Sequence, residues 1–164
     1  MTAEPERALR GFDRSLPMVL LRSRESAMSL FRPMLGEHDL TEQQWRVLRA
    51  LASATSPMAA GALAEVTFLL APSRSRRLTA LEQRSWIARE TPAHARRRSS
   101  LSLTESGRSV VAEIAPHSEA IYEQLEEQFG SDRLEALIAE LNALTDVGSS
   151  WAGRTSRTRR TPPP

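Results

Sequence analysis

Residues 59–84, AAGALAEVTFLLAPSRSRRLTALEQR, decide the fold of this 164-residue chain. The first part predicts a short helix over 59–68, in which Leu63 and Val66 would face inward at helical spacing. The second part predicts another helix over 71–84, with a proline near its start, where the missing N–H costs little. The stretch therefore predicts a helix, a short turn and a second helix, which is the helix-turn-helix arrangement.

The outward face of the second predicted helix suits contact with duplex DNA. We expect Leu78 and Leu81 to be its buried positions. A helical wheel centred on Leu78 then places small residues and arginines outside: Ser73, Arg76, Arg77, Ala80 and Arg84. Because arginine can bridge O6 and N7 of guanine and serine can reach bases or phosphates, this helix is predicted to enter the major groove.

A basic hairpin is predicted directly after this helix. Two short segments of strand character, residues 86–91 and 99–103, flank the arginine-rich residues 94–98. Arginines at such a tip can clamp phosphates or enter a minor groove; they are Arg96, Arg97 and Arg98. A helix-turn-helix followed by a basic hairpin is a winged helix, so we expect a mainly α fold with a small β-hairpin wing.

Two helices are predicted before this region. The first runs from residue 16 to about residue 35, and we expect Pro33 to kink or end it and Gly36 to mark its exit. The second has a clear start, because Thr41 and Gln44 have the spacing of a capping box.

Two further helices are predicted after the hairpin. Thr104 caps the first, which reaches about Phe129 with a bend at Pro116; Ser131 caps the second, and Gly148 is its expected stop. The first helix of the chain and these last two carry apolar stripes that the remaining chain is too short to cover. This predicts a homodimer built from the N- and C-terminal helices.

The predicted organisation has five parts. They are a flexible arm (1–14), an N-terminal dimerisation helix (15–40), a winged helix-turn-helix DNA-binding lobe (41–103), C-terminal dimerisation helices (104–149) and a disordered basic tail (150–164).

Charge is distributed unevenly along the chain. The net charge of +2 hides a window, residues 74–98, in which eight arginines and two glutamates give +6. In residues 104–149, two arginines and ten acids give −8. A concentrated basic segment between apolar periodic segments indicates nucleic-acid binding.

Composition and motifs exclude several classes of site. The absence of cysteine excludes disulfides and cysteine–zinc sites and fits a reducing cytoplasm. No apolar run approaches the roughly 20 residues that span a bilayer. His38, His94 and His117 are isolated and belong to no metalloprotease or nucleophile motif. We therefore expect a cytoplasmic protein with no catalytic residue, metal, cofactor or membrane partner.

Several segments, in this order, resemble the MarR family of dimeric winged-helix regulators, in particular its subgroup of homoprotocatechuate degradation operon regulators. They are LPMVLLRSRE (16–25), FRPML (31–35), TEQQWRVLRA (41–50), LLAPSRSRRL (69–78) and LSLTESG (101–107). The resemblance covers roughly residues 16–144, and the element order matches.

The resemblance implies a dimeric repressor that binds a pseudo-palindromic operator in double-stranded DNA and is released by a small aromatic or phenolic acid. It implies DNA contacts from the second helix of the helix-turn-helix and from the wing. The residues are Ser73, Arg74, Ser75, Arg76, Arg77, Arg84, Arg96, Arg97 and Arg98. It also implies a ligand pocket where the first, second and fifth helices meet, with candidates Met18, Arg22, Arg24, Arg32, Trp45 and Arg49. An arginine fork matches the geometry of a ligand carboxylate.

Three departures from the family pattern bear on these expectations. Ala95 stands where the family often has an aspartate before the wing arginines. Ser85 stands where the family has glycine, so it is predicted to take a backbone conformation that glycine adopts more easily. Arg74 and Arg77 occupy positions that are usually apolar, and they either add phosphate contacts or alter the packing of the recognition helix.

One alternative function stays open from the sequence. The chain could be a helical interaction protein whose basic segment binds an acidic protein partner instead of DNA, because a basic window does not distinguish between polyanions. Preference for one duplex sequence would separate the two readings.

Overall fold

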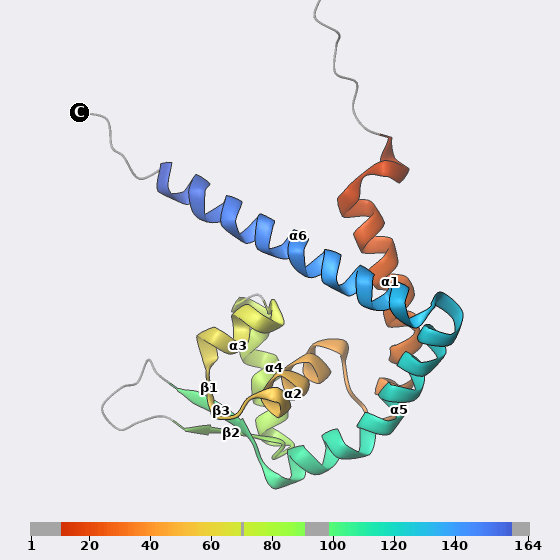
Figure 1. Cartoon of the computed structure of the whole chain (residues 1–164). Helices are drawn as coiled ribbons and strands as arrows, with labels where there is room; N and C mark the ends of the chain where they lie inside the picture. Colours follow the sequence, from red (N-terminus) through yellow and green to blue (C-terminus); the bar gives the residue numbers. More distant parts are fainter. Residues whose placement is uncertain (1–10, 70, 91–98, 159–164) are drawn as a thin grey trace, which may run out of the picture. The chain divides into compact units, whose positions relative to one another are not determined.

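The computed structural model describes residues 11–69, 71–90 and 99–158, with the backbone alone at 71–75 and 149–158. The elements follow one another as a 3-10 helix (Phe12–Arg14), α1 (Leu16–Glu37), α2 (Glu42–Ser53), β1 (Met58–Ala59), α3 (Ala60–Thr67), α4 (Ala71–Gln83), β2 (Ile87–Glu90), β3 (Ser100–Leu103), α5 (Glu105–Phe129) and α6 (Ser131–Thr158) (Figure 1). This order confirms the predicted mainly α fold with a small β wing. The chain divides into two compact units, one ending at Ser118 and the other beginning at Glu119.

The sheet is antiparallel and has the strand order β1-β3-β2. Leu101 in the central strand pairs with Met58 of β1 on one side and with Arg89 of β2 on the other. The strands β2 and β3 confirm the predicted hairpin segments. The strand β1 was not predicted, because two residues between a break and a helix carry no periodic signal.

The core of the first unit is aliphatic and is shared among its helices and the sheet. Its most deeply buried apolar side chains are Leu35, Val47, Leu48, Leu63, Leu81, Leu101 and Ile114. The prediction that Val66 faces inward is wrong, because this side chain is 56% exposed. In the two turns of α3, Leu63 and Thr67 share the buried face at a spacing of four residues, which places Val66 to one side.

The predicted helix starts at Thr41 and Thr104 are confirmed. The Thr41 hydroxyl accepts from the Gln44 N–H at 3.2 Å, and the Thr41 N–H donates to Gln44 Oε1 at 3.0 Å, which completes the capping box. The Thr104 hydroxyl accepts from the Gly107 N–H at 3.0 Å at the start of α5. These caps satisfy N–H groups that have no partner inside a helix.

Neither proline that was expected to disturb a helix ends one. The helix α1 continues past Pro33 to Glu37, so its predicted end at about residue 35 is early, and α5 continues through Pro116. Proline inside a helix costs about 3 kcal/mol, which packing of neighbouring residues can offset. Phe31, Met34 and Leu35 are buried around Pro33, while Ile114 and Ser118 are buried around Pro116.

The predicted end of the last helix at Gly148 is wrong. The start of the last helix is as expected, since Gly130 has a φ of +97° and separates α5 from α6. However, Ser131 is the first residue of α6 and the helix continues to Thr158, so the predicted disordered tail does not begin at residue 150. One glycine costs a helix only about 1 kcal/mol, and no proline follows until residue 162.

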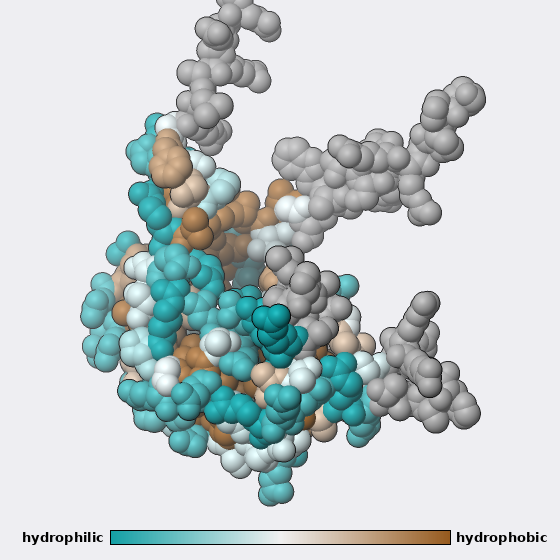
Figure 2. All heavy atoms as spheres, turned by 180° about the vertical axis from the view of Figure 1, so that it is seen from behind, coloured by the Kyte–Doolittle hydropathy of each residue, from teal (hydrophilic) through white to brown (hydrophobic). Residues whose placement is uncertain are grey.

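Apolar side chains remain exposed on α6 in the second unit. They are Leu137, Ile138, Leu141, Leu144 and Val147, which are between 37% and 59% exposed. The first unit has its own exposed apolar side chains on α1, namely Leu16, Val19, Leu21 and Leu30. Figure 2 shows apolar residues, in brown, open at the surface. Within the described ranges, no helix is both long and apolar enough to cross a membrane.

Candidate nucleic-acid interface and ligand site

The turn between α3 and α4 is formed around a strained residue, Phe68. Its φ is 52°, a left-handed conformation that bulky residues rarely adopt. The N–H of Leu69 donates to the Ala64 carbonyl at 3.2 Å, and the Leu69 side chain is buried while Phe68 is 76% exposed. This turn therefore ends α3 and anchors the chain through Leu69.

The helix α4 has the buried face that the sequence predicted, but of the described side chains predicted to face outward only Arg76 is exposed, while Arg77, Ala80 and Arg84 are half-buried. Leu78 and Leu81 are buried at 2% and 0% exposure, Arg76 is exposed and Arg77 is half-buried. The side chains of Ser73, Arg74 and Ser75 lie outside the described residues, although the helical backbone includes all three. The described part of α4 thus presents Arg76 to solvent on the face opposite the core.

The side chain of Arg84 contacts other parts of the first unit. Its Nη1 donates to the Asp39 carbonyl at 2.8 Å and its Nη2 to the His38 carbonyl at 3.3 Å. Its guanidinium carbon lies 3.6 Å from the centroid of the Trp86 ring. These contacts join the residue after α4 to the turn between α1 and α2, so the structure does not place Arg84 beside Arg76 as a second open side chain.

The base of the predicted wing is described, and its tip is not. Arg96, Arg97, Arg98 and Ala95 lie outside the described residues. At the base, Arg89 Nε donates to Glu82 Oε1 at 2.6 Å and Arg89 Nη1 to the Ser99 hydroxyl at 3.3 Å. Part of the charge of the basic window is therefore paired within the chain.

The prediction for Ser85 is confirmed, since its φ is 57°. Its carbonyl oxygen accepts from the hydroxyls of Thr104 and Ser106, each at 2.6 Å. These two contacts hold the left-handed turn against the start of α5. Sequence reasoning identified Thr104 as a helix cap but missed this second role, which only the tertiary fold reveals.

Two of the predicted ligand residues, Arg24 and Arg32, lie together in an ion-pair cluster with Glu25 and Glu42. Each arginine pairs with both glutamates; Arg32 Nε, for example, donates to Glu42 Oε1 at 2.6 Å. Glu42 is the first residue of α2, and the other three belong to α1. The two glutamates were missed from the sequence, although Glu25 and Arg32, about two helical turns apart, fall on the same side of the predicted first helix.

The cluster shifts the pKa of each member toward its charged form. A hydrogen bond from Arg32 lowers the pKa of Glu25. A hydrogen bond to Glu42 raises the pKa of Arg24, and one to Glu25 raises the pKa of Arg32. Burial pushes the pKa of Glu42 up, but hydrogen bonds from Arg32 and Arg24 outweigh it, so that the pKa is lowered. Both acids are therefore anions at neutral pH and neutralise the two arginines.

A cavity of about 520 Å³ opens beside the ion-pair cluster. The residues that line it are Arg24, Glu25, Arg32, Leu35, Gly36, Leu40, Thr41, Glu42 and Gln43. The other predicted ligand residues do not line it. Because the two glutamates neutralise the charge of both arginines, an incoming carboxylate would meet no uncompensated positive charge in this cluster.

The remaining ligand candidates are separate from this cavity. Arg22 Nη2 donates to the Asp13 carbonyl at 3.3 Å, and Met18 is half-buried on α1. Trp45 is 6% exposed and belongs to the core of the first unit. Arg49 follows one turn later on α2 and is exposed. In the described part of the chain, the candidate cation without an intramolecular partner is Arg49.

The chain is similar to proteins of one regulator family. The model of the MarR family matches residues 38–98. The homoprotocatechuate degradative operon repressor of Escherichia coli is 37% identical over 136 residues, which are 83% of this chain and 91% of that protein. The solved structure of the transcriptional regulator PA4135 is 38% identical, with a TM-score of 0.77 over 81% of this chain and 97% of that one.

A ligand-bound structure is also similar. NadR in complex with 4-hydroxyphenylacetate is 31% identical, with a TM-score of 0.76 over 84% of this chain and 99% of that chain. This overlap is longer than the match to the family model, which spans residues 38–98. Together with the helix-turn-helix of α3 and α4, these similarities show that the chain belongs to the MarR family and is a transcriptional regulator of that type.

Proposed function

We propose that this chain is a homodimeric, cytoplasmic repressor that binds a specific DNA duplex through α4 and is released by a small phenolic acid. The observation that carries the proposal is the arrangement of α4. Its buried Leu78 and Leu81 fix the helix against the core, and Arg76 faces outward after the turn at Phe68. An exposed arginine on such a helix can form two hydrogen bonds with one guanine.

Exposed apolar side chains support the homodimer. A contiguous apolar surface on a helix marks an interaction site, because leaving it in water costs free energy. Ile138 and Leu141 of α6 and Leu21 of α1 are between 37% and 50% exposed in the single chain. A second copy would cover these residues on both helices, and a twofold dimer would match a pseudo-palindromic operator.

The ligand proposal is centred on Trp45 and Arg49. These residues lie four positions apart on α2, so they share a face of that helix. The exposed guanidinium of Arg49 suits a carboxylate, and the indole of Trp45, which is only 6% exposed, would border the ring of an aromatic acid. The 4-hydroxyphenylacetate in the NadR complex and the homoprotocatechuate operon of the Escherichia coli relative both support an aromatic acid of this kind.

Selection of duplexes from a genomic or random pool tests DNA recognition. The selected duplex and a scrambled duplex would then be compared by fluorescence anisotropy at two salt concentrations. We expect an inverted repeat that the protein prefers to the scramble at both salt concentrations. Weak binding without sequence preference would refute the repressor and favour the alternative, in which the basic segment binds an acidic protein.

Addition of 4-hydroxyphenylacetate to the protein–operator complex tests the ligand proposal. We expect the anisotropy to fall as the duplex is released, and Arg49→Gln to require a higher ligand concentration. Arg22→Gln is the matched control, because Arg22 already donates to the Asp13 carbonyl. Equal sensitivity of both variants and the parent protein would remove Arg49 from the ligand site.

A further inference from the structure

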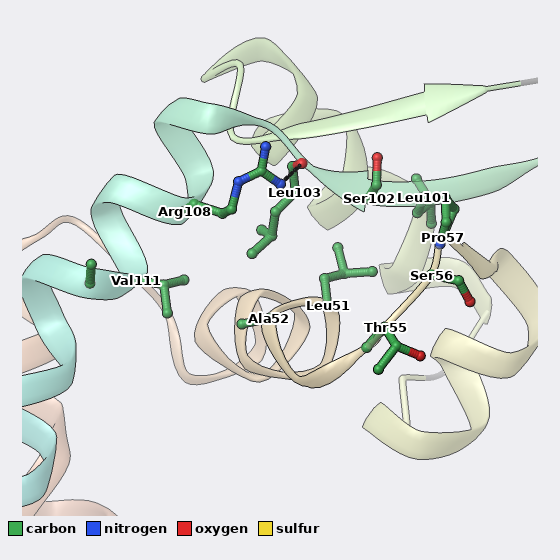
Figure 3. Close-up of a pocket in the computed structure, with 12 residues that line it drawn as sticks. Leu51, Ala52, Thr55, Ser56, Pro57, Leu101, Ser102, Leu103, Arg108 and Val111 are labelled. Carbon is green, nitrogen blue, oxygen red and sulfur yellow. Dashed lines mark hydrogen bonds between the residues drawn. The ribbon is translucent and has the colours of Figure 1, made fainter.

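A second cavity lies within the first unit, away from the ion-pair cluster. It has a volume of about 370 Å³ and opens between the end of α2, residues 54–57, β3 and the start of α5 (Figure 3). Its lining consists of Leu51, Ala52, Ala54, Thr55, Ser56, Pro57, Leu101, Ser102, Leu103, Arg108, Val111 and Ala112. Known small-molecule pockets measure about 300–1,000 Å³, so this cavity can hold a small ligand.

The floor of this cavity is aliphatic. Leu51, Leu101 and Leu103 are at most 6% exposed, and they offer the cavity a fixed apolar surface. Figure 3 shows Leu51 projecting from α2 and Leu103 from β3 toward the space between those elements. Ala52 and Ala112 are short side chains on its border, so the space beside them stays open. This surface favours a ligand with an apolar body.

One cation lies at the edge of the cavity. Arg108 Nη1 donates to the Leu103 carbonyl at 2.9 Å (Figure 3). The Arg108 side chain is exposed, and its remaining N–H groups have no partner within the described part of the chain. A guanidinium with free donors beside an apolar surface can pair with a carboxylate.

The charge of the lining differs from that of the ion-pair cluster. No aspartate or glutamate lines this cavity, whereas Glu25 and Glu42 neutralise the arginines of the cluster. The hydroxyls of Thr55, Ser56 and Ser102 add polar groups without adding charge. The cavity therefore has one uncompensated positive charge beside an apolar floor.

We propose that this cavity is a binding site for a small monocarboxylate with an aliphatic body, its carboxylate on Arg108 and its body against Leu51 and Leu103. The site is separate from the phenolic-acid site proposed at Trp45 and Arg49, and it does not depend on DNA binding.

Titration of the full chain with octanoate tests this site. Methyl groups of leucine and valine would be followed by NMR, with octan-1-ol and octylammonium as probes of the same body and different charge. We expect the methyl signals of Leu51, Leu103 and Val111 to shift in a saturable manner with octanoate. The alcohol should bind more weakly, and the ammonium more weakly still, because Arg108 repels it.

Variants separate this site from the rest of the molecule. Arg108→Gln should weaken octanoate binding by about tenfold, the order expected for one charge-assisted contact. Ala52→Leu and Ala112→Leu fill the cavity from two different helices and should each weaken binding as well. Arg49→Gln is the control and should leave octanoate affinity unchanged. Thermal unfolding of each variant establishes that it is folded.

Three outcomes would overturn the proposal. The first is the absence of saturable methyl shifts at millimolar octanoate in the parent protein. The second is equal binding of octanoate and octylammonium, which would remove the role of Arg108. The third is a loss of octanoate binding in Arg49→Gln but not in Arg108→Gln, which would place octanoate in the phenolic-acid site.

Discussion

The guanidinium carbon of Arg84 lies 3.6 Å from the centroid of the Trp86 ring, two residues further along the chain. The same guanidinium donates to the carbonyls of Asp39 and His38. Asp39 has a φ of 51°, so the turn that receives these hydrogen bonds is itself strained. One side chain thus connects the end of α4 with the turn that leads from α1 to α2.

Arg84→Ala should destabilise the protein rather than remove a DNA contact. We expect a loss of about 1–3 kcal/mol in the free energy of unfolding, from the cation–π contact and the two hydrogen bonds together. Arg84→Lys should recover only part of it, because an ammonium cannot stack and donate to two carbonyls in the same way. Urea denaturation measures both variants, and an Arg84→Ala protein as stable as the parent would contradict this role.

Arg84 also illustrates what the sequence could predict and what it could not. The apolar spacing predicted the buried positions Leu78 and Leu81, and the helical wheel centred on Leu78 placed Arg84 outside the core, where it is half-buried. A wheel describes one helix, however, and contains no information about the carbonyls of residues 38 and 39, which are more than forty residues away. Local signals therefore predicted the elements, while long-range partners of exposed charges could not be predicted.

The same difference between local signals and long-range partners explains why the predicted ligand residues Arg24 and Arg32 turned out to be ion-paired. The resemblance selected Arg24 and Arg32 as cations for a ligand, but their pairing with Glu42 depends on how α1 meets α2. Some helix ends could likewise be predicted from local sequence, and others could not. The capping box at Thr41 is a local pattern and was predicted, whereas the continuation of α1 past Pro33 depends on buried neighbours.

Arg76→Ala should weaken binding to the selected operator by about 1–3 kcal/mol, the usual value of a good base contact. Arg77→Ala is expected to act in the same direction, although the half-buried position of Arg77 adds a packing cost. Because Arg76 is exposed, its substitution should change the free energy of unfolding by less than about 0.5 kcal/mol. Anisotropy against the operator and the scramble measures the effect, and unchanged affinity in both variants would remove α4 as the reading helix.

Ser85→Gly should stabilise the protein. At a φ of 57° a side chain costs about 1–2 kcal/mol that glycine does not pay. The extra freedom of glycine in the unfolded chain opposes this by about 0.4–1 kcal/mol, so the net gain should lie between about 0 and about 1.6 kcal/mol. Ser15→Gly is the matched control, because Ser15 has a φ of −72° and should gain nothing. A Ser85→Gly protein less stable than its parent would show that the Ser85 backbone is not strained.

The ion-pair cluster should make stability depend on pH in the acid range. The pKa values of Glu25 and Glu42 are lowered from 4.5 in the folded chain, so the folded state binds fewer protons than the unfolded state there. Their contribution is therefore complete above the unfolded value and is lost as the pH falls through the lowered pKa values. We expect the free energy of unfolding to fall below about pH 4.5, and Glu42→Gln to reduce this dependence.

Urea denaturation at a series of pH values between neutral and strongly acid measures this difference. Glu65→Gln is the control, because Glu65 is an exposed glutamate on α3 that lies outside the ion-pair cluster. The parent and this control should follow the same curve. If Glu42→Gln followed it as well, the ion pairs would not contribute to stability in solution.

Ile138→Glu should convert the proposed dimer into monomers. Ile138 is 48% exposed on α6, and a partner that covered it would have to bury the new carboxylate without a counter-charge. Sedimentation at micromolar concentration should find a dimer for the parent chain and a monomer for the variant. Val66→Glu is a control of the same chemistry, because Val66 is also apolar and is 56% exposed, but on α3. A dimer that survived Ile138→Glu, or one that Val66→Glu dissociated equally well, would place the interface elsewhere than on α6.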